Sequence, residues 1–267
     1  MTFSKETLLK ETLLKEKVGI VTGSAQGLGE AIAQLAAHEG SRLVLADIQA
    51  EAGESVADAI RRTGGEAVFQ RTDVTDSEQV ALLVDTAVER FGRLDWICNN
   101  AVGGAGQFGP LDQLDDRGWT TTVDVCLKGV FHGMKYAIPA MLAGGGGSVV
   151  NITTSGLFKG EAMLGAYVAA KGGVHALTMS GAAEYSGRGV RINSVAPGGM
   201  ETPAIARYFE KFPEFKQKTI DQHAMRRLGR PAEVAEPVVW LASDRASFVT
   251  GSCIVCDGGT LVNSHLL

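Results

Sequence analysis

The sequence predicts an α/β protein in which about seven parallel strands form one sheet between two layers of helices, a doubly wound sandwich. From Val18 onward, short apolar runs rich in β-branched residues alternate with amphipathic stretches of helical length. Many glycines stand singly at the ends of the apolar runs, where a strand can turn tightly into a helix. Strands separated by helices form right-handed βαβ units with a parallel sheet. No linker-like change in composition divides the chain, so residues 17–267 are expected to form a single domain.

The predicted elements follow one another in strand–helix order. Composition and period predict strands at Val18–Thr22, Arg42–Asp47, Ala67–Thr72, Leu94–Asn99, Ser148–Thr153, Val190–Val195 and Ser252–Cys256. Helical patterns fall between them, for example at Gly29–Glu39, Ala50–Arg62, Ser77–Phe91, Arg117–Leu142 and Gly165–Tyr185.

Two segments stand outside this alternation. Residues 1–16 contain the run Lys-Glu-Thr-Leu-Leu twice in tandem, and we expect them to form a mobile or helical tail outside the domain. The region 198–230 shows no clear period and places aromatic residues among charges. Because a long insertion in a compact domain is usually functional, we expect this region to form an active-site lid.

Charge and composition exclude several classes of protein. A net charge of −5 argues against a nucleic-acid-binding surface. No apolar run approaches the roughly 18 residues of a membrane span, and the N-terminus lacks the apolar core of a signal peptide. The four cysteines lie in apolar segments, as is typical of reduced cysteines in a cytoplasmic protein. Neither Cys253-x-x-Cys256 nor the five histidines have partners at ligand spacing, so no metal is expected.

A glycine-rich turn follows the first predicted strand and runs into the first predicted helix. Its glycines allow a tight turn and a close approach of the backbone to a pyrophosphate, and the helix N-terminus offers unpaired N–H groups to phosphates. The spacing is Gly-x-x-x-Gly-x-Gly, which differs from the G-x-G-x-x-G dinucleotide fingerprint. The expected cofactor contacts are Gly23, Ser24, Gln26, Gly27, Leu28 and Gly29.

The second predicted strand ends in Asp47, eighteen residues beyond Gly29. A carboxylate there can accept hydrogen bonds from the adenosine ribose hydroxyls and would repel a 2′-phosphate. Ile48 and Gln49 follow, with no arginine or lysine to bind that phosphate, so NAD(H) is favoured over NADP(H). The same position is also compatible with a cap of the helix that begins at Ala50.

Tyr167 and Lys171 stand four residues apart in a stretch, Ala166–Ser180, that is predicted to be helical. Residues at this spacing lie on one face of a helix. A tyrosine with a pKa near ~10 is a poor acid–base catalyst at neutral pH unless a nearby cation stabilises its anion. Such a pair also occurs on solvated helix faces, so its meaning depends on the other motifs.

In this order, the glycine turn, Asp47 and the Tyr167/Lys171 pair resemble the motifs of the short-chain dehydrogenase/reductase family, over about residues 17–259. The resemblance implies a Rossmann-like fold, a nicotinamide cofactor, and a homo-oligomer that is a tetramer or a dimer. Asp257-Gly258-Gly259 is similar to the C-terminal signature of the family, which lies near subunit contacts.

Further cofactor contacts follow from the same resemblance. Asp73-Val74 is similar to the pair that contacts the adenine, and Asn99-Asn100-Ala101 to the motif that lines the cofactor cleft, although Val102 stands where a glycine is usual. In Pro197–Thr202, the match implies that the Met200 backbone holds the carboxamide and Thr202 reaches the pyrophosphate. The contacts implied are Ile48, Asp73, Val74, Asn100, Ala101, Tyr167, Lys171, Pro197, Gly198, Met200 and Thr202.

The catalytic group departs from the family at two positions. The family's serine, thirteen residues before the tyrosine, is matched by Thr154, whose hydroxyl can steady a carbonyl or alkoxide oxygen. Ser155 is the alternative, but one residue further along a strand it would point to the opposite face. The family's helix asparagine is matched by Cys126, whose thiol cannot replace the hydrogen bonds of an amide. The resemblance implies that the asparagine shapes the helix so that a backbone carbonyl holds a water molecule in a proton relay to Lys171. Activity is therefore expected with this relay altered, and Asp124 is expected to point elsewhere on the helix.

The sequence thus predicts an NAD(H)-dependent oxidoreductase that interconverts a secondary alcohol and a ketone by hydride transfer, with Tyr167 as the acid–base residue. Nearby apolar and aromatic residues favour a small to medium, largely apolar substrate. One alternative is a non-catalytic or partner-dependent NAD-binding subunit, because Cys126 and Thr154 depart from the pattern. Another is an NADPH-dependent reductase of 3-ketoacyl groups on acyl-carrier protein, which Asp47 disfavours. The expected substrate contacts are Thr154, Ser155, Phe158, Met163 and Tyr208.

Overall fold

Seven parallel strands form one sheet in the order β3-β2-β1-β4-β5-β6-β7. The computed structural model describes residues 12–103 and 109–264. The chain runs outward from β1 to β3, returns to pair β4 with β1, and then runs outward to β7. The predicted fold class is therefore confirmed. The strands are β1 (Val18–Thr22), β2 (Arg42–Asp47), β3 (Ala67–Arg71), β4 (Trp96–Asn99), β5 (Gly147–Ile152), β6 (Val190–Pro197) and β7 (Cys253–Cys256).

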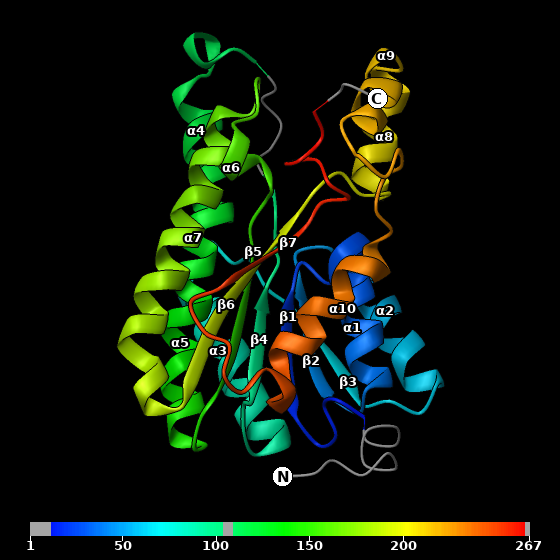
Figure 1. Ribbon diagram of the computed structural model, residues 1–267. Coiled ribbons are helices and arrows are strands. Elements are labelled where there is room, and N and C mark those ends of the chain that lie inside the picture. Colours follow the sequence, from blue (N-terminus) through cyan, green and yellow to red (C-terminus); the bar gives the residue numbers. More distant parts are fainter. Residues whose placement is uncertain (1–11, 104–108, 265–267) are drawn as a thin grey trace, which may run out of the picture.

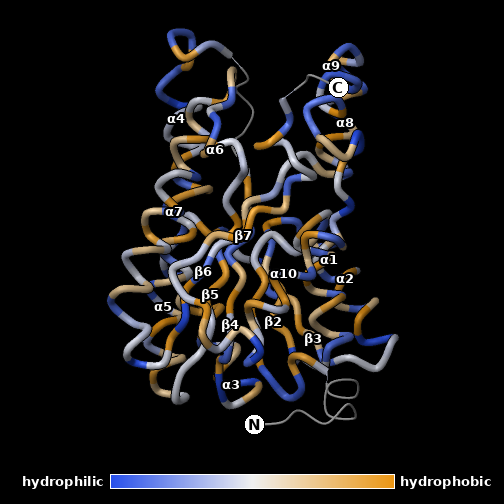
Figure 2. The backbone as a smooth tube through the Cα atoms, in the orientation of Figure 1, coloured by the Kyte–Doolittle hydropathy of each residue, from blue (hydrophilic) through white to orange (hydrophobic). Residues whose placement is uncertain are grey.

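Helices cover both faces of this sheet (Figure 1). On one face, Ile32 and Val238 are fully buried in a core cluster, and on the other face Leu83 and Val174 are fully buried in a second cluster. Figure 2 shows the hydrophobic strands running through the centre of the molecule. No helix in the described ranges is both long and apolar enough to cross a membrane. The first layer contains α1 (Gly27–His38), α2 (Ala50–Arg62) and α10 (Pro231–Ala242), and the second contains α3 (Ser77–Phe91), α5 (Gly129–Ala143) and α7 (Gly165–Tyr185).

The single helix predicted at Arg117–Leu142 is wrong in one respect, because a π-helical segment interrupts it. This segment, η2 (Asp124–Lys128), joins α4 (Asp116–Val123) to α5, and the Gly129 N–H donates a hydrogen bond to the Asp124 carbonyl across it. A π turn inserts one residue into an α-helix and often occurs at functional sites. The apolar pattern on each side still reads as helix, so the sequence pattern conceals the insertion. Predicted strand ends differ from the observed ones by only about two residues.

The region 198–230 contains two helices that its lack of period conceals, α8 (Pro203–Lys211) and α9 (Glu214–Asp221). The Thr202 hydroxyl caps α8 by accepting a hydrogen bond from the Ile205 N–H at 3.3 Å, and Pro203 occupies the first turn. Both are recognised signals of a helix start. Neither helix contains a buried residue, and both project beyond the carboxyl ends of the strands (Figure 1).

The chain joins the domain earlier than the predicted boundary at Lys17. Leu14 is fully buried against the α1 face of the core, and its N–H donates to the Glu39 carbonyl at 2.9 Å. The Leu13 N–H donates to the Glu39 carboxylate at 2.7 Å. The predicted tail 1–16 is therefore corrected from Leu13 onward, because burial of a leucine side chain stabilises the packed segment. Residues 1–11 lie outside the described residues.

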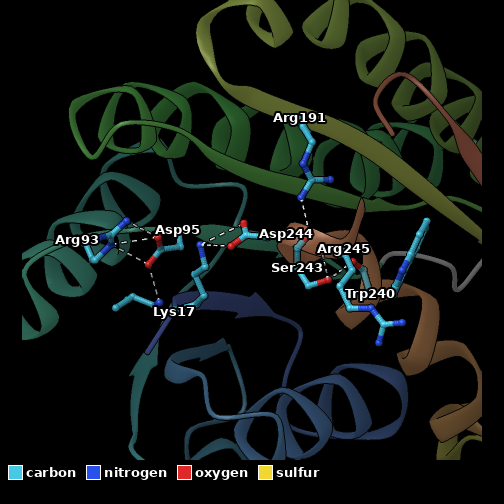
Figure 3. Close-up of polar contacts among 9 residues, drawn as sticks. Lys17, Arg93, Asp95, Arg191, Trp240, Ser243, Asp244 and Arg245 are labelled. Carbon is cyan, nitrogen blue, oxygen red and sulfur yellow. Dashed lines mark hydrogen bonds and ion pairs between the residues drawn. The ribbon is translucent and has the colours of Figure 1, made fainter. Parts of the chain in front are cut away.

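Polar contacts fasten the amino-terminal end of the sheet (Figure 3). Asp95, just before β4, accepts a hydrogen bond from the Val18 N–H at 2.8 Å and pairs with Arg93 at 2.6 Å. Lys17, just before β1, pairs with Asp244 at 3.1 Å. The Val18–Asp95 hydrogen bond joins the starts of the adjacent strands β1 and β4, and the Lys17–Asp244 pair joins the start of β1 to the segment that follows α10. The opposite, carboxyl end of the parallel strands carries the cleft described next.

Candidate active site

A cleft of about 710 Å³ lies at the carboxyl ends of the strands, where the chain crosses over between β1 and β4. Ligands of open α/β sheets bind at such a crossover. Most of the predicted site residues meet there: Gly23, Gln26, Gly27, Leu28, Gly29, Asp47, Ile48, Asp73, Val74, Asn100, Ala101, Thr154, Tyr167, Lys171, Pro197, Gly198, Met200 and Thr202. The lining also includes residues that the motifs do not indicate: Gln49, Thr72, Thr75, Val102, Gly103, Thr121, Asp124, Val125, Ile152, Thr153, Gly199, Pro203, Ala204 and Ile205.

The glycine turn at the start of α1 has room only for glycine. Gly23 and Gly27 have φ angles of 65° and 62°, in the left-handed region that glycine adopts without strain. A Cβ on Gly29 would lie 2.0 Å from the Gly23 carbonyl oxygen, and one on Gly23 would lie 2.8 Å from the Ala101 Cα. The Gln26 side chain makes no capping hydrogen bond at this helix start. The turn therefore brings bare backbone and helix N–H groups to the cleft, which fits a dinucleotide pyrophosphate.

Asn100 fixes this turn to the end of β4. Its amide nitrogen donates to the Thr22 and Gly23 carbonyls, both at 3.0 Å, and its backbone N–H donates to the Thr22 hydroxyl at 3.0 Å. Ser24, a predicted cofactor contact, is fully buried and is not part of the cleft lining. Its hydroxyl donates to the Ala46 carbonyl at 3.3 Å, so in this structure it supports the turn from behind.

Asp47, the last residue of β2, lines the cleft. Its carboxylate accepts hydrogen bonds from the Ala25 N–H at 3.1 Å and the Gln49 N–H at 3.0 Å. The N-cap position of α2 is Gln49 and not Asp47, so the helix-cap alternative does not describe this residue. A carboxylate has about four acceptor positions, which leaves capacity for ribose hydroxyls. Ile48, beside it, is 58% exposed and offers no charge to a 2′-phosphate.

Asp73 and Val74, which follow β3, line the same end of the cleft. The Asp73 carboxylate accepts hydrogen bonds from the Thr75 N–H at 2.9 Å and the Thr75 hydroxyl at 2.8 Å. The Val74 carbonyl lies 2.9 Å from Nδ1 of His132, a buried histidine of α5. These contacts fix the loop that follows β3 at the rim of the cleft.

Tyr167, Lys171 and Thr154 meet on the opposite wall. Tyr167 and Lys171 lie one turn apart on α7, and the ammonium lies 5.8 Å from the centre of the tyrosine ring. Lys171 is fully buried, and its ammonium donates to the Ile152 carbonyl at 2.7 Å, which leaves two donors for other partners. The Thr154 hydroxyl accepts a hydrogen bond from the Gly156 N–H at 3.2 Å, and its effect on the neighbouring Tyr167 phenol is to lower the pKa of that group.

Burial dominates the ionisation of this pair. It raises the pKa of the Tyr167 phenol well above its ordinary value, Cys126 and Glu161 raise it further, and the hydrogen bond with Thr154 opposes the shift. Burial also lowers the pKa of the Lys171 ammonium. The lowering of the tyrosine pKa expected from Lys171 is therefore not the dominant effect in this structure, because loss of water disfavours both charged forms.

Cys126 lies in the π-helical segment and does not line the cleft. Its side chain is fully buried, and the thiol lies 3.7 Å from the Gly103 carbonyl, to which it donates. Asp124 does line the cleft, so the prediction that it points elsewhere on the helix is wrong. The π turn accounts for the difference, because an extra residue rotates the helix face that precedes it.

The predicted substrate residues lie mostly outside the cleft lining. Ser155 is buried, and its backbone N–H donates to the Pro197 carbonyl at 2.8 Å. Phe158, in α6 (Gly156–Lys159), is half exposed and contacts His175, while Met163 is also half exposed. The Tyr208 ring packs among the other aromatic rings of α8 and α9. Of the five, Thr154 alone appears in the lining.

Within residues 12–103 and 109–264, no cluster of three histidine, cysteine or acidic side chains could hold a metal ion. Cys253 and Cys256 are free thiols. The donor set of the cleft, which combines a bare backbone turn, an acceptor at Asp47 and a buried lysine, instead fits an organic dinucleotide.

The whole chain has known relatives. A family model described as Enoyl-(Acyl carrier protein) reductase matches residues 23–260. The chain is 41% identical over 242 residues to cyclohexanol dehydrogenase of Acinetobacter sp. (strain SE19), which covers 91% of this chain and 94% of that protein. It is 42% identical over 245 residues to cis-4-hydroxycyclohexanecarboxylate dehydrogenase of Sinomonas cyclohexanicum, with coverage of 91% and 96%.

A solved structure of a related enzyme is also similar to this chain. The crystal structure of levodione reductase matches with a TM-score of 0.88 and 34% identity, and it covers 94% of this chain and 100% of that one. The ordered motifs, the sheet with its crossover cleft, and the full-length similarity agree, and the chain belongs to the short-chain dehydrogenase/reductase family.

Proposed function

We propose that this protein is an NAD(H)-dependent oxidoreductase that interconverts a secondary alcohol and a ketone by hydride transfer. The observation that carries the proposal is the convergence of Tyr167, Lys171 and Thr154 on one wall of the cleft that the glycine turn and Asp47 close from the other side. The relatives named above oxidise alcohols on six-membered rings, as their names state. A cyclic secondary alcohol of small to medium size is therefore the favoured substrate.

The bound nicotinamide would supply hydride chemistry, while the protein orients the substrate and moves the proton. The glycine turn, the α1 N-terminus and Thr202 would hold the pyrophosphate, Asp47 the adenosine ribose, and the Met200 backbone the nicotinamide carboxamide. In alcohol oxidation, the Tyr167 oxygen takes the hydroxyl proton and the Thr154 hydroxyl donates a hydrogen bond to the alkoxide oxygen as it forms. Lys171 supplies positive charge beside the phenolate.

The NAD preference is tested by replacing the carboxylate of Asp47. The wild-type protein is expected to have a higher kcat/KM for NAD than for NADP, because the carboxylate accepts ribose hydrogen bonds and repels a 2′-phosphate. Asp47→Ser is expected to lower the ratio of these two kcat/KM values by about tenfold or more. Asp85→Ser, which removes an exposed aspartate of α3, is the matched control and should leave the ratio unchanged. A wild-type protein that prefers NADP would contradict the assignment of Asp47.

A non-catalytic or partner-dependent NAD-binding subunit is the second candidate, because Cys126 replaces the amide that usually shapes the relay. The π turn at Cys126 favours the catalytic candidate, because the helix is distorted at this position although the amide is absent. The variant Cys126→Asn, assayed on a panel of cyclic alcohols, separates the two candidates. We expect a turnover within about fivefold of wild type, because the π turn is already formed with cysteine at this position. A wild-type protein that turns over only with a co-expressed relative, or gains activity only as Cys126→Asn, would favour the second candidate.

A homo-oligomer in the cytoplasm is part of the proposal. Trp119, Phe131 and Met179 are 43%, 46% and 47% exposed on α4, α5 and α7, helices that lie in one layer. Apolar side chains exposed on one layer support a protein–protein contact, in a tetramer or a dimer. The four free cysteines support a reducing compartment. A reductase of carrier-protein-linked 3-ketoacyl groups is less well supported, because Asp47 opposes NADPH, and the cofactor comparison above tests it too.

A further inference from the structure

A buried histidine connects helix α9 to the loop that lines the cleft after β6. His223 follows α9 and is 2% exposed. Its Nδ1 lies 2.8 Å from the Thr219 carbonyl oxygen, and the Gly199 N–H donates a hydrogen bond to its Nε2 at 3.1 Å. A carbonyl oxygen only accepts and a backbone N–H only donates, so Nδ1 carries the proton and Nε2 does not. Both ring nitrogens are thus used, and the imidazole is held as the neutral Nδ1–H tautomer.

The backbone of Gly199 is held on both sides. Its N–H bonds to His223, and its carbonyl accepts a hydrogen bond from the Gly229 N–H at 3.0 Å. The next residue, Met200, pairs with Gly229 in a parallel β-bridge. Gly198, Gly199 and Met200 all line the cleft. A shift of the Gly199 N–H would therefore move backbone that faces the cofactor.

The imidazole ring also fills the space beside two glycines. A Cβ on Gly199 would lie 3.0 Å from the His223 Cε1 atom, and one on Gly258 would lie 3.3 Å from its Cδ2 atom. Such close packing leaves the ring little freedom to turn, which fixes the direction of Nε2. His223 does not itself line the cleft, so it acts on a bound cofactor through Gly199.

The same ring ties α9 to the loop at the cleft. The structure shows no buried residue in α9, so little burial of its own holds this helix in place. Carbonyl groups in the last turn of a helix lack partners within the helix, and the His223 Nδ1–H supplies one for Thr219. His223 therefore connects two parts of the region 198–230, the loop at the cleft and a helix that projects beyond the strands (Figure 1).

We propose that His223 is a positioning residue for the nicotinamide end of the cofactor, because its unprotonated Nε2 holds the Gly199 N–H and so sets the backbone from Gly198 to Met200. This inference rests on the proposed function, in which the Met200 backbone holds the nicotinamide carboxamide. The adenosine end depends on different contacts. Asp47 ends β2, and β1, β4 and β5 separate that strand from β6 in the sheet. His223 should therefore affect the nicotinamide half of the cofactor and not the adenosine half.

The test replaces His223 by the two side-chain amides, which differ in length by one carbon. In His223→Gln the amide oxygen lies near the position of Nε2 and can accept from the Gly199 N–H, whereas in His223→Asn the shorter side chain reaches only the position of Nδ1. The full chain is compared as wild type, both variants and the control His38→Gln, which changes an exposed histidine of α1. Dissociation constants are measured for NADH and for adenosine monophosphate, which lacks the nicotinamide. Turnover of cyclohexanol gives kcat and the KM for NAD.

His223→Asn is expected to weaken NADH binding by about fivefold or more and to lower kcat by about tenfold or more, because a small misplacement of the reacting carbon slows the transfer. Its affinity for adenosine monophosphate should stay within about twofold of wild type. His223→Gln should restore NADH affinity and kcat to within about threefold, and His38→Gln should match wild type. Wild-type values in His223→Asn, equal losses in the two amide variants, or an equal loss of affinity for both nucleotides would each overturn the inference.

Nitrogen NMR of the wild-type protein labelled with ¹⁵N-histidine gives a readout that needs no substitution. The inference predicts a protonated Nδ1 and an unprotonated Nε2 for His223, and any other protonation of this ring overturns it. A wild-type protein that binds NADH but oxidises no cyclic alcohol contradicts the proposed function, while the comparison of NADH with adenosine monophosphate still decides the role of His223. A wild-type protein that does not bind NADH contradicts both.

Discussion

Tyr167→Phe is expected to lower kcat for alcohol oxidation by about a thousandfold, within the range that general acid–base groups contribute. The substitution removes one oxygen and keeps the ring that packs beside Lys171, so the loss reports proton transfer and not folding. Tyr185→Phe, at the end of the same helix, is the matched control and should retain wild-type turnover. Cofactor binding, measured by quenching of protein fluorescence, should stay within about threefold in both variants. Full activity in Tyr167→Phe would remove this residue from the mechanism.

The direction of the pKa shift gives this prediction a second readout. Oxidation needs the phenolate, which exists above the pKa of Tyr167, whereas ketone reduction needs the protonated phenol, which exists below it. Because burial raises this pKa, wild-type oxidation should accelerate as the pH rises through the neutral and alkaline range. Ketone reduction should remain nearly constant in the neutral range. Pre-steady-state rates of the chemical step across pH check this, and an oxidation rate that is independent of pH would contradict it.

Gly29→Ala is expected to raise the KM for NAD by about tenfold or more, because the turn cannot accept a methyl group. The new Cβ would lie 2.0 Å from the Gly23 carbonyl oxygen. This neighbour is backbone, so relief requires movement of the loop that faces the pyrophosphate. The measurement is the dissociation constant for NADH together with the KM for NAD.

Gly172→Ala is the matched control for that variant. It adds the same methyl group inside α7, where no atom beyond the neighbouring residues and the surrounding helix backbone lies within 4 Å of the new Cβ, and it should bind NADH as wild type does. Thermal unfolding of both variants separates a local defect from a global one. Equal cofactor affinity in Gly29→Ala and wild type would mean that the glycine turn does not hold the pyrophosphate.

The sequence predicts the sheet well because its signals are local. Each strand is a short apolar run bounded by polar or glycine residues, and burial on both faces of a parallel sheet requires such a run. The cleft follows from the same logic, since residues after consecutive strands, such as Gly23, Asp47 and Asn100, meet at one edge. Motif order could therefore place the cofactor residues without knowledge of any distance.

Features that depend on packing could not be predicted in this way. The π turn at Cys126 leaves the apolar pattern on both sides helical, so neither the turn nor the exposure of Asp124 in the cleft has a signal in the pattern. The position of the predicted substrate residues, four of which lie outside the cleft lining, could not be predicted for a different reason. Aromatic residues such as Phe158 and Tyr208 suggest a substrate contact in the sequence, but only the folded conformation of their segments determines whether the side chains face the cleft.

The central claim is that a hydride passes between the carbinol carbon of a cyclic alcohol and the nicotinamide of NAD in this cleft. It is tested most directly by incubating the purified protein with NAD and cyclohexanol that carries deuterium on its carbinol carbon. The mass spectrum of the recovered NADH is then compared with that from unlabelled cyclohexanol. The account predicts that the reduced cofactor carries the deuterium. Formation of cyclohexanone with unlabelled NADH, or no reduction of NAD with any cyclic alcohol, would contradict it.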